Sequence, residues 1–469
     1  MSQANNLLKN TIIYAVGNFG SKVFSFALLP VFSFFLTKAQ LGIYDLLITT
    51  LNLSLPIISL QISDAVYRWL LDYKHNSKEQ SKIIKQALII LISSLFISQI
   101  LIYIISYFYK FPYRDLYSLL ILFSCLLPFA QQIVRGMGYN KLYSVSGVIN
   151  SCLILFISIF FLFTNFVEDK VEGILIALIL ANAITFIFIF IFIRINKKVI
   201  LHEPVDFKFQ LSLLKYSLPL IFNAISWWVI NASSRFIILE FMQIEDNGIY
   251  AVSTRLPALL TIINSVFMLA WQDMIIADQN KDNPFFTELF NKYFIFVICI
   301  SLICLSASPF IVYYLFDNKF YEAWKYVPFL FMGAAFSSIS AFVGAAYLKA
   351  KETKGVLITS IIAAVINILI SVGLIKYIGL YAPAIGTFVS FVVMLIIRIM
   401  DTRKMLVIKI NLVQTIGLSL ITILFTFILI YSQNKTVSAI LTSLSLMLFI
   451  YLNYDLLKNL MNKITLRIR

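Results

Sequence analysis

The chain has 469 residues, of which 61% are hydrophobic and only 13% charged, and its mean hydropathy is +0.91. A soluble protein of this size needs a polar shell that this composition does not supply, so we exclude a soluble fold and take the lipid bilayer as the solvent. The net charge of +15 would suit a nucleic-acid partner, but its distribution along the chain argues against one.

The apolar runs predict an all-α polytopic membrane protein with about 14 transmembrane helices, because about 20 apolar residues are needed to cross a bilayer as a helix. The N-terminal segment is short and polar and the first run is too long for a signal peptide, so none is evident. In chain order, the predicted spans are 11–36, 42–64, 84–108, 116–134, 142–163, 171–193, 211–239, 248–272, 291–315, 326–348, 355–375, 380–398, 410–431 and 436–456.

The connectors between these spans alternate in positive charge. One alternate set, which includes the connector that starts at Arg398, holds roughly three times as many Lys and Arg residues as the other. Such connectors face the cytoplasm, so we expect both termini to be cytoplasmic and the protein to lie in the bacterial cytoplasmic (inner) membrane. The charge therefore orients the protein and gives no reason to expect a nucleic acid.

Two tripeptides recur in one register. Leu7-Leu8-Lys9 and Gly42-Ile43-Tyr44 return as Leu213-Leu214-Lys215 and Gly248-Ile249-Tyr250. The offset spans six predicted helices and so preserves orientation, which indicates a parallel repeat of two six-helix bundles followed by two extra helices. The predicted domains are an N-lobe (1–195, helices 1–6), a cytoplasmic linker (196–210), a C-lobe (211–400, helices 7–12) and two extra C-terminal helices, 13 and 14 (401–469).

Polar residues inside the first span gather on one face. Thr11, Tyr14, Asn18, Ser21, Lys22 and Ser25 fall within an arc of roughly 100°. Lys22 lies at the centre of the span, where a charge usually faces a protein interior or a water-filled cavity. For Lys22 we favour a cavity, and for the serines a helix-packing seam.

Span 7 is the repeat equivalent of span 1 and carries a similar stripe, with Asn223, Asn231 and Arg235. Arg235 is near the outer end of the span and Arg255 is nearer the outer side of span 8, so both could instead reach the interface. A cavity lined by Lys and Arg without matching carboxylates favours an anion, and Arg suits phosphate. The candidate substrate-binding residues are therefore Lys22, Arg235, Arg255, Asn18, Asn223 and Asn231.

Most of the eleven prolines also fall within the spans. Each leaves a backbone carbonyl without its helical donor, which membrane helices tolerate where a neighbour or cavity water satisfies it. Two interpretations stay open: the prolines bend helices that rock between states, or they are ordinary prolines of membrane helices.

The motifs of an enzyme or an ATP-driven pump are missing from the sequence. There is no phosphate-binding loop, no His or Cys spacing typical of a metal site, and the outward connectors are short. The four cysteines lie in apolar runs and suit small hydrophobic side chains. We expect no cofactor, no metal and no enzymatic activity.

The stretches Leu7–Lys22 and Gly42–Asp45 and the connector Arg135–Lys141 resemble bacterial polysaccharide (O-antigen or capsule) repeat-unit flippases. Length, span number and repeat extend the resemblance over the chain. It implies the multidrug/oligosaccharidyl-lipid/polysaccharide exporter superfamily, two lobes in a V shape, and an undecaprenyl-diphosphate-linked oligosaccharide as substrate. The family's cationic cavity would then include Lys22, Arg235 and Arg255.

The expected function is a flippase that moves this lipid-linked repeat unit across the membrane by alternating access, for lipopolysaccharide O-antigen or other surface polysaccharide. The resemblance also allows a polysaccharide polymerase and a chain-length regulator as partners, besides the lipid bilayer. A multidrug exporter of the same superfamily, a membrane glycan polymerase or ligase, and a scaffold without transport activity are the alternatives. A multidrug exporter would need buried carboxylates to bind cationic drugs, and an enzyme would need larger outward loops.

Overall fold

The computed structural model describes residues 20–73, 76–108, 113–164, 166–197, 204–277, 284–350, 353–454 and 458. Within these ranges all regular secondary structure is helical, and the chain divides into two compact units, Met1–Trp228 and Val229–Arg469. The division falls inside one helix, α8 (Phe207–Phe241). The boundaries that the repeat predicts for the two lobes and the linker between them stay a prediction.

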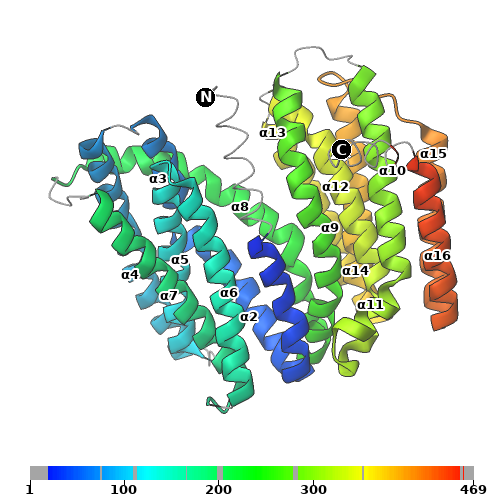
Figure 1. Ribbon diagram of the computed structural model, residues 1–469, viewed down its shortest axis with the longest axis horizontal. Helices are drawn as coiled ribbons and strands as arrows, with labels where there is room; N and C mark the ends of the chain where they lie inside the picture. Colours follow the sequence, from blue (N-terminus) through cyan, green and yellow to red (C-terminus); the bar gives the residue numbers. More distant parts are fainter. Residues whose placement is uncertain are drawn as a thin grey trace, which may run out of the picture. The chain divides into compact units, whose positions relative to one another are not determined.

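Unit 1 begins, in its described part, with the helix Gly20–Phe35. A capping box then starts the next helix, since the Gln40 N–H donates to the Thr37 hydroxyl and the Thr37 N–H donates to the Gln40 side-chain oxygen. The following helices are α2 (Lys38–Ile58), α3 (Ile62–Asp72), α4 (Ser77–Phe108), α5 (Arg114–Gly136), α6 (Asn140–Thr164) and α7 (Lys170–Lys197), and they are drawn in blue to green in Figure 1.

Unit 2 continues α8 and ends with two helices that lie against α10, drawn in orange and red in Figure 1. Its helices are α9 (Ile244–Ala277), α10 (Pro284–Ser306), α11 (Ser308–Leu315), the 3₁₀ helix η1 (Asn318–Lys325), α12 (Val327–Ala350), α13 (Thr353–Ile378), α14 (Tyr381–Thr402), α15 (Leu412–Ser432) and α16 (Lys435–Leu452).

The described helices confirm an all-α polytopic membrane fold. Eleven are long and apolar enough to cross a bilayer, and Gly20–Phe35 is a shorter apolar helix. Together with α8 and α9, they occupy the positions of the predicted spans. Because eleven described helices are long and apolar enough to cross a bilayer, the total of fourteen membrane-spanning helices stays a prediction.

The same neighbours recur inside each unit, as the repeat predicts. In unit 1, α5 packs against α7, α7 against α6, and α3 and α4 against α5. In unit 2, the helices six spans later pack alike: α12 against α14, α14 against α13, and α9 and α10 against α12. Two pseudo-symmetric bundles plus the extra pair α15 and α16 are therefore present.

The second predicted span, 42–64, ends earlier than expected, because α2 stops at Ile58. Leu60 and Gln61 then have φ values of 50° each, a left-handed conformation that side chains rarely adopt. The Ser94 hydroxyl donates to the Ile58 carbonyl at this break, at 2.5 Å. The membrane-spanning helix α2 and the shorter helix α3 thus replace one continuous helix.

Asp64 and Arg68 are four residues apart on α3 but do not pair with each other. Arg68 instead bonds Asp72 one turn further along α3, at 2.6 Å. Asp64 accepts from Gln132 on α5, at 3.4 Å. Both arrangements are set by the α2–α3 break, after which α3 packs on α5.

Arg398 was expected in a cytoplasmic connector, but α14 continues past it to Thr402 and the side chain is 3% exposed. Its guanidinium donates to the hydroxyls of Thr359 and Ser360 and to the Ser340 carbonyl, at 3.1, 3.3 and 3.0 Å. These bonds join α12, α13 and α14. A charge count along the sequence cannot separate such an interior cation from a connector cation.

A buried glutamine attaches the start of α8 to α4. Gln86 is fully buried and bonds the Pro204 carbonyl, the Asp206 N–H and the Gln210 amide. Beside it, the Lys82 ammonium is 2.9 Å from Asp206 and holds the pKa of that carboxyl below its usual range. The N-terminal end of α8 is therefore a fixed part of unit 1.

Candidate functional site

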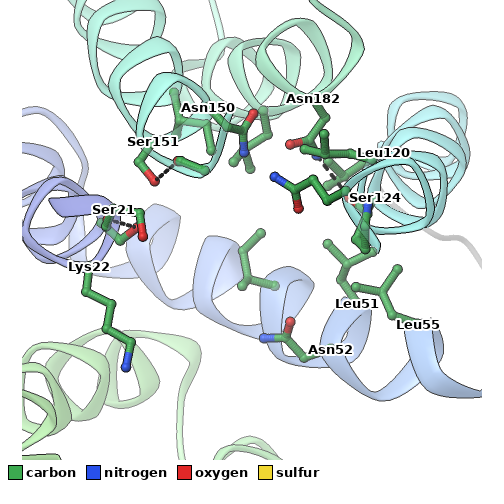
Figure 2. Close-up of a pocket in the computed structure, with 18 of the residues that line it drawn as sticks. Ser21, Lys22, Leu51, Asn52, Leu55, Leu120, Ser124, Asn150, Ser151 and Asn182 are labelled. Carbon is green, nitrogen blue, oxygen red and sulfur yellow. Dashed lines mark hydrogen bonds between the residues drawn. The ribbon is translucent and has the colours of Figure 1, made fainter. Parts of the chain in front are cut away.

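A half-open cavity of about 550 Å³ in unit 1 is lined by Gly20–Phe35, α2, α5, α6 and α7 (Figure 2). Its lining residues are Ser21, Lys22, Ser25, Tyr44, Ile48, Leu51, Asn52, Leu55, Leu120, Ser124, Leu127, Pro128, Gln131, Tyr143, Ser144, Gly147, Asn150, Ser151, Ile154, Leu178 and Asn182. The volume is in the range of small-ligand sites, about 300–1,000 Å³.

Each wall is one face of a helix. On α5 the lining residues Leu120, Ser124, Leu127 and Gln131 are spaced by three or four positions, which places them on one stripe. The lining positions of α2 and α6 follow the same spacing. Because polar and apolar residues alternate along these stripes, no single helix reveals the cavity by a strongly polar face.

Lys22 contributes the one charged side chain among the lining residues, where no Asp, Glu or Arg occurs. It is partly buried, and Ser21 and Ser25 line the wall beside it. Ser25 bonds the Ser21 carbonyl at 2.9 Å. Figure 2 shows the Lys22 amine pointing away from the side where Asn150 and Asn182 lie. The cavity thus has a cationic side and a neutral polar side.

The neutral side consists of carboxamides and hydroxyls. Asn182 donates to the Ser124 hydroxyl at 3.2 Å, and the Asn150 carbonyl oxygen accepts from Thr185 at 3.3 Å. Gln131 donates to Ser146 at 3.3 Å. These bonds hold the amide groups in place from α5, α6 and α7.

Arg235 and Arg255 belong to unit 2 and are not among the lining residues of this cavity. Arg235 is partly buried on α8, donates to the Thr254 hydroxyl at 3.0 Å and lies over the Tyr250 ring, 5.4 Å from its centre. Arg255 is partly buried on α9. A role for either in substrate binding stays a prediction.

Three other predicted site residues cannot be placed. Asn18 lies outside the described residues, and so do the side chains of Asn223 and Asn231 on α8. The described half of the first polar stripe, Ser21, Lys22 and Ser25, lines the cavity. Whether that cavity binds substrate is a question for experiment.

Sequence reasoning missed the amides of the cavity wall. Asn52, Gln131, Asn150 and Asn182 each stand nearly alone in a separate predicted span. A search for carboxamides inside spans would have found all four, since buried polar groups in lipid are costly. Their convergence follows from tertiary packing, which one sequence does not report.

Comparison with known proteins gives a family and a fold. Residues 7–272 match the model of a family described as "Polysaccharide biosynthesis protein". A search of curated protein sequences finds no significant match.

Solved structures of two kinds of transporter share the fold. The lipid II flippase MurJ, in an inward closed conformation, matches with a TM-score of 0.67 and 15% identity, over 96% of this chain and 100% of that one. A multidrug resistance MATE family transporter of the MOP superfamily matches in its inward-facing form with a TM-score of 0.63 and 16% identity, and in its outward-facing form with 0.59 and 14%. Both forms cover 84% of this chain and 95% of theirs.

The family model covers more than half of the chain, and the likeness to solved structures extends over most of it. The eleven apolar helices of the described part agree with the membrane location of such transporters. The chain therefore belongs to the polysaccharide biosynthesis protein family, and it is a multi-pass membrane protein with the fold shared by MurJ and the MATE transporters.

Proposed function

We propose that the protein is a flippase that moves an undecaprenyl-diphosphate-linked oligosaccharide repeat unit across the bacterial cytoplasmic membrane. The single observation that carries the proposal is the cavity of unit 1, which has one cation and no carboxylate among its lining residues. Family membership and the fold shared with a lipid II flippase support the same class of substrate.

Lys22 is the proposed phosphate-binding group of the cavity. An ammonium in a membrane-enclosed cavity interacts more strongly with an anion than it would in water, because the surroundings screen it less. A charge-assisted hydrogen bond to phosphate contributes about 1.5–3 kcal/mol. Arg235 and Arg255 are candidates for the same chemistry in unit 2.

The oligosaccharide would occupy polar space while the polyprenyl tail stays in lipid. Alternating access requires that the site open to one side at a time, and the MATE transporter is known in inward-facing and outward-facing forms. We propose the same cycle here, with both termini in the cytoplasm. The polymer made from the flipped unit would be an O-antigen, a capsule or another surface glycan.

A multidrug exporter is the second candidate, because the MATE structures share the fold. The cavity disfavours it, since an amine is poorly suited to a cationic drug and no lining residue is an acid.

Deletion of the gene tests the proposal. We expect lipid-linked oligosaccharide to accumulate and surface polymer to disappear, with drug resistance unchanged. In a complemented strain Lys22→Ala should reduce surface polymer at equal protein level, and Lys22→Arg should retain most of it because the charge remains. Loss of drug resistance without accumulation of lipid-linked sugar would favour the exporter.

A further inference from the structure

The polar lining of the cavity is richer in neutral amides than in charge. Four carboxamides, Asn52, Gln131, Asn150 and Asn182, reach it from four helices, against a single ammonium. Each carboxamide offers both a donor NH₂ and an acceptor oxygen. A site for phosphate alone needs donors, so the acceptors indicate that a second kind of group is bound.

Hydrogen-bonding capacity remains available on these amides within the described part of the chain. Asn182 donates to Ser124 but its carbonyl oxygen has no donor there, and Asn150 accepts from Thr185 but its NH₂ has no acceptor. Asn52 is exposed on α2 and makes no hydrogen bond to any described residue. Because Asn182 is only 8% exposed, a polar ligand or water must satisfy it.

Two prolines leave backbone acceptors on two of the lining helices, α2 and α5. Pro56 and Pro128 lie four residues after Asn52 and Ser124, so neither can supply the helical N–H that the carbonyls of those two residues would otherwise receive. Both carbonyls belong to lining residues. In a membrane helix such a carbonyl is tolerated where it lines a cavity.

Sugar hydroxyls are the groups that match this lining. A hydroxyl donates one hydrogen bond and accepts others, so neighbouring hydroxyls on a ring are complementary to mixed amide donors and acceptors. The apolar lining residues Leu51, Leu120 and Leu127 would contact the C–H faces of a ring. The volume of about 550 Å³ suits one or two sugar rings rather than a lipid tail.

We infer that Asn52, Asn150 and Asn182 form a glycan-recognition subsite that reads the sugars next to the diphosphate and sets the specificity of transport. The inference rests on the proposed function, because it assigns the substrate's sugars to these carboxamides and its diphosphate to Lys22. The amides make the protein prefer a glycosylated lipid over the bare carrier. Lys22 acts on both.

Binding of two probes to the purified full-length protein separates the roles. The probes are undecaprenyl diphosphate and the lipid-linked oligosaccharide extracted from the deletion strain, each measured in nanodiscs. We expect the wild type to bind the glycosylated lipid at least tenfold more tightly than the bare carrier. Asn52→Leu, Asn150→Leu and Asn182→Leu should each reduce that preference at least threefold, with binding of the bare carrier unchanged.

Lys22→Ala should weaken binding of both probes by the same factor and leave the preference intact. Gln99→Leu is the matched control, because this amide on α4 bonds Ser118 and is not among the lining residues. Retained binding of bare undecaprenyl diphosphate shows that each asparagine variant is folded.

Every other outcome refutes either the glycan subsite or the proposed function. Equal binding of both probes by the wild type, or asparagine variants that keep the full preference, would refute the glycan subsite and leave the flippase intact. Failure of the wild type to bind either probe would refute the proposed function itself.

Discussion

At the scale of single residues, the placement of each cation decides its role. Lys22, at the centre of a span, was expected to face a cavity and is among the residues that line one, while its role in binding stays a prediction. Arg398 was assigned to a connector, yet it is buried within α14. The difference arises because Arg398 has neutral partners on two neighbouring helices, which no sequence spacing reveals.

Arg398 gives the first prediction. Both Arg398→Lys and Arg398→Met should lower the thermal unfolding midpoint in detergent, and Lys should be at least as damaging. Lys keeps a buried charge that needs compensation, but its single amine cannot reach the three partners that the guanidinium bonds. Met removes both the charge and the bonds.

Arg403, exposed just beyond the end of α14, provides the control, and Arg403→Met should leave the midpoint unchanged. If Arg398→Lys were as stable as the wild type, the hydrogen bonds of the planar guanidinium would contribute little to the stability of the protein.

Gly138 gives the second prediction. Its φ of +89° forms the turn between α5 and α6, and no atom lies within 4 Å of the position that a Cβ would take. Gly138→Ala should therefore cost about 1–2 kcal/mol through backbone strain alone. Gly138→Asn should cost less, because Asn tolerates the left-handed region better.

The measurement is again the thermal midpoint, with Gly417→Ala in α15 as the control. That glycine also has open space around it and no positive φ, so alanine there should be neutral or stabilising by up to about 1 kcal/mol. Equal effects of Ala and Asn at position 138 would contradict the strain argument.

At the scale of elements, hydropathy located the membrane helices well and their breaks poorly. Most apolar runs predicted their helix to within a few residues, because burial in lipid requires a long apolar stretch. The run 291–315 instead covers two helices, since α10 ends at Ser306 and α11 begins at Ser308, and the start of the first span lies outside the described residues. The sequence did not predict the break after Ile58, because Leu60 and Gln61 are not residues typical of a turn. It is held by a bond from Ser94 on α4, a tertiary contact.

The junction between α4 and α8 gives the third prediction. Gln86→Leu would leave the buried Gln210 amide without its partner and would remove the bonds to the Pro204 carbonyl and the Asp206 N–H, which water can reach. We expect destabilisation of about 1–3 kcal/mol, the cost of one unsatisfied buried group. Ser93→Leu, on an exposed position of the same helix, should have little effect.

If Gln86→Leu had the same thermal midpoint as the wild type, the prediction would be wrong. The segment around Gln86 would then unfold locally before the rest of the protein.

At the scale of the whole molecule, the repeat and the fold were predictable and the site was not. Two tripeptides in one register indicated the repeat, and the packing partners within each unit agree with it. The cavity required the side chains of five separate helices to converge. The sequence reports which residues are polar, whereas their meeting depends on how the helices are rotated against one another.

Orientation in the membrane gives the fourth prediction. In a chain without its native cysteines, Glu168→Cys between α6 and α7 should react with a membrane-impermeant maleimide added to intact cells. Lys404→Cys, between α14 and α15, should react only after the membrane is permeabilised, because we expect the positively charged connectors to face the cytoplasm. The reverse labelling pattern would invert the proposed topology.

The most direct test of the account is the movement of a lipid-linked oligosaccharide between leaflets. The purified protein is reconstituted into sealed vesicles that carry this lipid in both leaflets, and impermeant periodate is added outside. We predict that the wild type makes nearly all of the glycan reachable, that Lys22→Ala slows the process roughly 10-fold or more as expected for one lost charge-assisted bond, and that protein-free vesicles protect about half. Protection of the inner half in the presence of the wild-type protein would contradict the account.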